Sequence, residues 1–158
     1  MAQLLTKYFG WIDAAPEAFI EFPSGLPGFE RERRFVQIRA QAHGPLVFLQ
    51  SAATPELCFL AAPIQAVDDR YELEMAPEES RVLELPEPAQ PGIGGDVEAL
   101  VLLSLAVEGG ATANLLAPVV LNPRSRKAVQ AVRRDRRYSS RHSISLCATA
   151  VAKEAPCS

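Results

Sequence analysis

The stretch Thr-Ala-Asn-Leu-Leu-Ala-Pro-Val-Val-Leu-Asn, residues 112–122, decides the fold that this sequence predicts. Its apolar run is nearly continuous, interrupted by Pro118 and bracketed by Asn114 and Asn122. Proline has no N–H for a sheet ladder, so Pro118 indicates a bend, and the following Pro123 ends the run in a turn. We therefore expect a buried strand entered through a bend, with the two Asn side chains bonding to local backbone.

The segment just before this stretch is the most apolar of the chain, and residues 97–107 predict a central strand. A Glu-Gly-Gly-Ala turn at 108–111 joins it to residues 112–121, so the two segments predict the core hairpin. Apolar and β-forming residues predict further strands at 4–12, 18–22, 35–39, 46–51, 57–62, 68–74 and 138–146. Residues 124–137 fit either a helix with its arginines exposed or a strand at 127–133.

One short helix is expected at residues 77–85, because Pro77 suits a first helical turn and acidic residues follow it. Many short strands separated by regular turn signals are typical of a barrel. The chain has 158 residues, 48% of them hydrophobic, enough for one domain with a core. We predict a mainly β, small antiparallel β-barrel-like single domain with one or two short helices, spanning residues 1–146. Residues 147–158 are expected to form a flexible tail.

A tight loop follows the predicted strand at 18–22, because two Pro and two Gly fall within residues 23–28. Pro27-Gly28 suits a type II turn. The apolar residues Phe22, Leu26 and Phe29 flank or occupy this loop. Leu26 and Phe29 either plug the end of the core or, if exposed, anchor a partner.

Charge is distributed unevenly along the chain. Residues 1–110 hold 7 Lys/Arg against 17 Asp/Glu, whereas residues 111–158 hold 9 against 2. Such a division either steers a charged partner or is neutralised within the fold. Arg133, Arg134, Arg136, Arg137 and Arg141 form a basic patch with only Tyr138 interleaved. The acidic remainder would repel phosphate, so we expect no direct nucleic-acid binding.

The chemistry-bearing residues do not form a recognisable catalytic or metal set. The two histidines, His43 and His142, are far apart, and the three cysteines lack metal-ligand spacing. We expect no enzymatic activity, cofactor or metal. No apolar run has the length of a membrane helix and no secretory signal is evident, so we expect a cytoplasmic protein without a membrane partner. The alternative function is a small-ligand-binding barrel whose cavity is lined by Tyr8, Trp11, Phe48 and Tyr71.

Five segments carry a resemblance to known proteins: YFGWID at 8–13, FPSGLPGFE at 22–30, FLQS at 48–51, TANLLAPVVLNPRSRKAVQ at 112–130 and YSSRHSI at 138–144. Together, in this order and spacing, they resemble one family, the FliW flagellar assembly factors. The resemblance spans about residues 5 to 146 and favours the strand interpretation of 127–133. It implies a barrel-like, non-enzymatic protein of the cytoplasm.

The resemblance also implies two competing protein partners, flagellin and the translational repressor CsrA, whose repression of flagellin synthesis the factor blocks. CsrA binds RNA and so presents positive surface, which an acidic face would attract. The candidate residues for that face are Glu72, Glu74, Glu78 and Glu79. The candidate anchors for flagellin are Phe22, Leu26 and Phe29. We expect a monomer.

Overall fold

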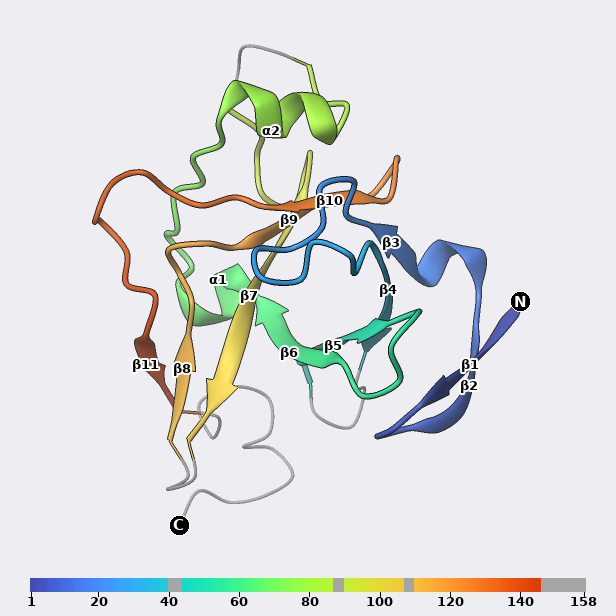
Figure 1. Cartoon of the computed structure of the whole chain (residues 1–158). Coiled ribbons are helices and arrows are strands. Elements are labelled where there is room, and N and C mark those ends of the chain that lie inside the picture. The colour runs from blue at the N-terminus through green and yellow to red at the C-terminus, as the bar shows by residue number, and fades with distance from the viewer. Residues whose placement is uncertain (40–43, 87–89, 107–109, 146–158) are drawn as a thin grey trace.

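The computed structural model describes residues 1–39, 44–86, 90–106 and 110–145. The strands that form its central ring are β3 (Phe19–Glu21), β4 (Arg34–Arg39), β5 (Val47–Ser51), β6 (Cys58–Pro63), β7 (Glu98–Leu105), β9 (Val119–Asn122) and β10 (Lys127–Gln130). They pair in the order β7–β6–β5–β4–β3–β10–β9, and β9 returns to β7. These seven strands close a barrel, and the predicted mainly β barrel domain is confirmed (Figure 1).

The direction of pairing differs from the expectation at one place. Ring neighbours are antiparallel except β3 and β10, which run parallel and meet where Lys127 lies opposite Glu21. The Glu21 N–H donates to the carbonyl oxygen of Arg126 over 2.9 Å. The barrel is therefore mixed rather than purely antiparallel, and its parallel pair joins two strands that lie far apart in the sequence.

Strand β7 is the longest in the ring and organises the rest. Its first half pairs with β9, and its second half pairs with β8 (Ala111–Ala113), which in turn pairs with β11 (His142–Ile144). The predicted core hairpin is thus confirmed, and residues 114–118 form the bend between β8 and β9. Asn114 Oδ1 accepts from the Ala117 N–H and Asn122 Oδ1 from the Arg124 N–H, as expected. Part of the predicted turn, residues 107–109, lies outside the described residues.

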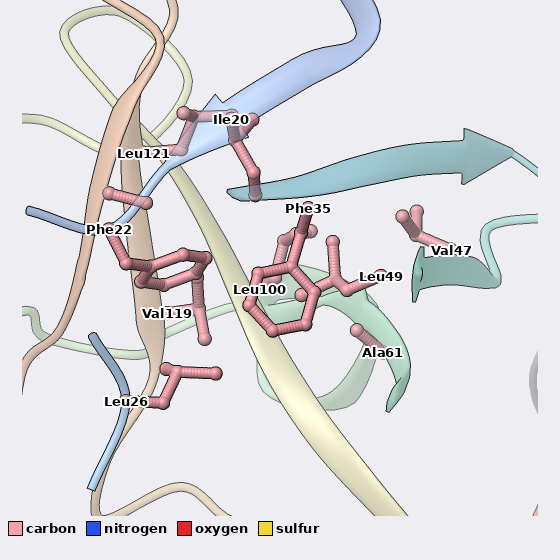
Figure 2. Packing of buried hydrophobic residues seen from close by; sticks show 11 residues of the cluster. Ile20, Phe22, Leu26, Phe35, Val47, Leu49, Ala61, Leu100, Val119 and Leu121 are labelled. Atoms are coloured by element: carbon pink, nitrogen blue, oxygen red, sulfur yellow. The ribbon is translucent and has the colours of Figure 1, made fainter. Parts of the chain in front are cut away.

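Apolar side chains fill the interior of the barrel. Figure 2 shows the rings of Phe22 and Phe35 between Leu49, Leu100 and Val119. The two rings meet edge to face with centroids 5.4 Å apart. Packed side chains occupy this described core of the barrel, which argues against the ligand cavity of the alternative function.

The first residues of the chain form a hairpin beside the barrel, where one strand at 4–12 was expected. Strand β1 (Ala2–Thr6) pairs only with β2 (Gly10–Ala14) among the described residues. Thr6 closes the turn, because its hydroxyl donates to the carbonyl of Gly10 and accepts from the N–H of Phe9. Gly10, with φ of +64°, ends this turn and begins β2.

Helical segments are short in the described chain. Helix α2 (Pro77–Val82) confirms the predicted helix, whereas α1 (Ile64–Val67) and the 3₁₀ turn η1 (Pro16–Ala18) were not predicted. Strand β10 confirms the strand alternative for residues 127–133. The predicted tail at 147–158 lies outside the described residues.

Residues 68–74 are not a strand, which corrects the expectation. Tyr71 and Met75 point into the core while Glu72 and Glu74 face solvent, so the alternation itself is present. Side chains rather than a ladder satisfy this backbone. The Glu72 N–H donates to the hydroxyl of Tyr138, and Met75 exchanges two hydrogen bonds with the amide of Gln90.

Candidate partner-binding surface

The three candidate apolar anchors in and beside the loop after β3 differ in their exposure to solvent. Phe22 is 0% exposed and Leu26 is 2% exposed, so both belong to the core and are removed from the candidate partner surface. Phe29 is 42% exposed and packs edge to face on Phe59 with centroids 5.5 Å apart. Leu26 therefore plugs the end of the core, and Phe29 is the one anchor of the three that reaches solvent.

The conformation of this loop is fixed by its glycines. Gly25 has φ of +69° and donates to the carbonyl of Phe22 over 2.9 Å. Gly28 has φ of +85° in the turn that the Phe29 N–H closes onto the carbonyl of Leu26 over 2.7 Å. The positive φ follows from the Pro-Gly pair, which confirms the predicted turn. The Gly28 N–H also donates to Glu30 Oε2.

Two of the four candidate acidic residues are engaged by arginines. Arg137 donates to both carboxylate oxygens of Glu72, at 2.7 and 3.1 Å, and this pairing lowers the pKa of Glu72. Arg133 Nη2 lies 3.5 Å from Glu74 Oε2. At these positions the basic end of the chain neutralises the acidic part within the fold.

Arg133 is buried, although the helix interpretation of its segment placed it in solvent. Its guanidinium donates to both oxygens of Asp135, at 2.9 and 2.6 Å, and to the carbonyl of Glu72 at 2.5 Å. It also lies over the ring of Tyr138, 5.0 Å from the centroid. This bonding lowers the pKa of Asp135. The lone acid within the run Arg-Arg-Asp-Arg-Arg is the sequence signal that could have revealed the pairing.

The other two candidate acids lie on α2. Glu79 Oε1 accepts from the N–H of Ala76 over 2.7 Å, which caps the helix, and burial raises the pKa of Glu79. Glu78 is exposed in the same first turn. Asn122 Nδ2 donates to the carbonyl of Leu83 over 2.7 Å and fastens the end of this segment to the barrel.

A surface groove of about 360 Å³ brings part of the candidate set together. Its apolar lining, which we call the floor, consists of Leu26, Pro27, Val82 and Val129. Glu30, Glu78 and Glu79 also line it. The groove thus joins the loop after β3 to α2 and β10, and it excludes Glu72 and Glu74, which the salt bridges hold elsewhere.

Potential metal ligands are dispersed over the described residues. No three His, Cys, Asp or Glu side chains among them converge as metal ligands, and no described helix is long and apolar enough to cross a membrane. His142 is exposed on β11, and His43 lies outside the described ranges. Tyr8 and Trp11 lie exposed on the β1–β2 hairpin while Tyr71 is buried in another cluster, so the proposed ligand-lining aromatics do not share a cavity.

The sequence and the structure of this chain are similar to those of one family of known proteins. Residues 3–144 match the sequence model of the family described as FliW protein. The flagellar assembly factor FliW of Desulfitobacterium hafniense is 36% identical over 138 residues, covering 86% of each chain. That of Bacillus subtilis is 32% identical and covers 88% of this chain and 94% of its own. A crystal structure of the flagellar assembly factor FliW superposes with a TM-score of 0.79 at 29% identity, covering 90% of this chain and 96% of that one.

Proposed function

The chain belongs to the FliW family of flagellar assembly factors, and on that premise we propose that it binds flagellin and the translational repressor CsrA in the cytoplasm. By occupying CsrA it relieves the repression of flagellin synthesis. Flagellin competes for the factor, so export of flagellin releases the factor to act on CsrA. The work is done by protein–protein contact, without catalysis, cofactor or direct contact with nucleic acid.

The net charge of the first 110 residues supports an encounter with a basic partner. CsrA is an RNA-binding protein and so presents positive surface, which an acidic face attracts while it repels the RNA. Of the four candidate acids, Glu78 is exposed and Glu79 lies beside it on α2. Glu72 and Glu74 pair with arginines, so we assign them a smaller share of the attraction.

For flagellin, the proposed contact is Phe29. It presents a large apolar ring at the surface of a loop whose backbone is fixed, and aromatic anchors on rigid supports give affinity at a low entropic cost. Phe22 and Leu26 contribute indirectly, because they hold the loop against the core. We propose that residues 1–146 carry the whole activity, that 147–158 are a flexible tail, and that the protein is a monomer.

The observation that carries this proposal is the family match over residues 3–144. The test is capture of partners from flagellated cells with the tagged protein, followed by identification of flagellin and CsrA. With purified components, increasing flagellin is expected to release CsrA from the tagged protein. Capture of neither partner, or simultaneous saturation by both, would contradict the proposal. A chain ending at residue 146 is expected to give the same result, and light scattering checks the monomer.

A further inference from the structure

The groove between the loop after β3 and α2 combines an apolar floor with carboxylates and has no Lys or Arg in its described lining. We propose that this groove seats a protein segment in which an apolar side chain is flanked by Lys or Arg, and that the basic regulator of the proposed function supplies that segment. The identity of this partner, CsrA, rests on the proposed function, and the groove is its proposed site of contact.

The floor selects for an apolar side chain. Pro27 is exposed, Val82 is half-buried and Val129, at 8% exposure, adds a smaller share, and the three come from separate segments that line the same space. Covering it removes apolar surface from water, which is the main favourable term in association. The groove has a volume of about 360 Å³, which limits what enters it to a small part of a partner protein.

The carboxylates select for positive charge beside that apolar group. The Glu78 carboxylate makes no hydrogen bond or ion pair with any described residue, so it can turn toward a partner. Glu30 and Glu79 are held in place by the N–H groups of Gly28 and Ala76. Arg134 is near enough to lower the pKa of Glu79, against the dominant raising effect of burial, and it offsets part of this charge. Glu78 therefore contributes most to the preference of the groove for a positively charged segment.

The walls of the groove are already in place without a partner. Leu26 anchors the loop after β3 in the core, and the glycine turns on either side of it fix the backbone of that loop. On the other wall, Asn122 bonds to Leu83 and Lys127 pairs with Glu84 at 2.7 Å. A preformed groove loses little conformational entropy on binding, which favours a recognition role.

Two substitutions test the charged part and the apolar part of this groove separately. Glu78→Arg reverses the exposed charge, and Val82→Thr replaces a floor methyl by a hydroxyl at nearly constant volume. The matched control is Glu56→Arg in the loop between β5 and β6, an equal change of charge at an exposed site outside the lining. The binding of purified CsrA to each variant is measured by calorimetry, and circular dichroism checks that each is folded. If Glu78→Arg disturbs the folding of α2, the binding of Glu78→Gln is measured in its place.

We expect Glu78→Arg to weaken CsrA binding about tenfold and Glu56→Arg to change it by less than about twofold. Val82→Thr is expected to weaken binding without changing its salt dependence. In the ¹⁵N spectrum of the wild type, CsrA should shift the amide signals of Gly25 and Gln130. Equal affinities of Glu78→Arg and Glu56→Arg, or flagellin shifting those signals in place of CsrA, overturns the inference while the proposed function stands. A wild type that binds neither protein overturns the proposed function itself.

Discussion

Arg133 and Glu72, 61 residues apart in the chain, are joined by a hydrogen bond from the guanidinium Nη1 to the main-chain carbonyl oxygen over 2.5 Å. The Arg133 side chain is only 4% exposed and binds Asp135 with both arms of its fork. Buried charges persist where such bonds satisfy them. The bond therefore attaches the irregular segment before α2 to the segment after β10, where no sheet ladder does so.

Arg133→Met is expected to lower the free energy of unfolding by about 2 kcal/mol, because it removes charged hydrogen bonds and leaves the Glu72 carbonyl without this donor. Urea denaturation followed by circular dichroism measures the change. Arg136→Met is the matched control, since Arg136 is exposed, and its effect should stay within about 0.5 kcal/mol. Equal losses in the two variants would show that the buried bonds contribute nothing specific.

Tyr71 is expected to ionise only at strongly alkaline pH. Its hydroxyl donates to the carbonyl of Leu115 over 2.7 Å, and burial raises its pKa to about 12 from an ordinary 10. A pKa that is higher in the folded than in the unfolded state means stability that is complete below pH 10 and lost as the pH rises toward 12.

Absorbance at alkaline pH detects this ionisation directly. The wild type should show a late tyrosinate step near pH 12, which Tyr71→Phe removes. Tyr8→Phe, a change at an exposed site on the β1–β2 hairpin, should leave that late step intact. Persistence of the step in Tyr71→Phe would assign it to another residue.

The sequence predicted the elements whose signals are local. The apolar segment 97–107, a Gly-Gly turn and the run at 112–122 give the β7 hairpin, because periodicity and turn chemistry agree there. The loop after β3 followed from the φ preferences of Pro27 and Gly28. The groove was not predictable, since it depends on α2 and β10 meeting that loop across a long sequence separation.

The errors have physical causes as well. At the N-terminus the apolar residues run through the turn, and the bonds of Thr6 rather than a turn dipeptide close it. At 68–74 the alternation is that of a strand, yet the hydroxyl of Tyr138 and the amide of Gln90 satisfy the backbone in place of a neighbouring strand. The burial of Arg133 was not predicted because its ion pair with Asp135 was not recognised in the sequence.

Gly25→Ala is expected to destabilise the protein more than Gly28→Ala. Both glycines have positive φ, where a Cβ costs about 1–2 kcal/mol. At Gly25 the added Cβ would also lie 2.5 Å from the carbonyl oxygen of Glu30, a backbone atom that cannot move aside, whereas at Gly28 it meets nothing within 4 Å. Chemical denaturation of both variants measures the difference. Equal destabilisation would show that the loop yields at Gly25 and that φ alone decides the cost.

The four candidate glutamates are expected to differ in their effect on CsrA binding. Glu78→Gln removes a carboxylate that has no described partner, so affinity should fall about threefold at low salt and the difference should shrink as salt rises.

Glu72→Gln should act in two ways. It removes one charge and releases Arg137 from a bond of 2.7 Å, so the net effect is a more positive surface around residues 72 and 137. If this region faced CsrA, the loss would exceed that of Glu78→Gln; because we place the contact at the groove, we expect a smaller loss. Calorimetric titrations at two salt concentrations rank the variants, with Glu56→Gln as the control. A ranking led by Glu72 would move the acidic contact from α2 to the segment that precedes it.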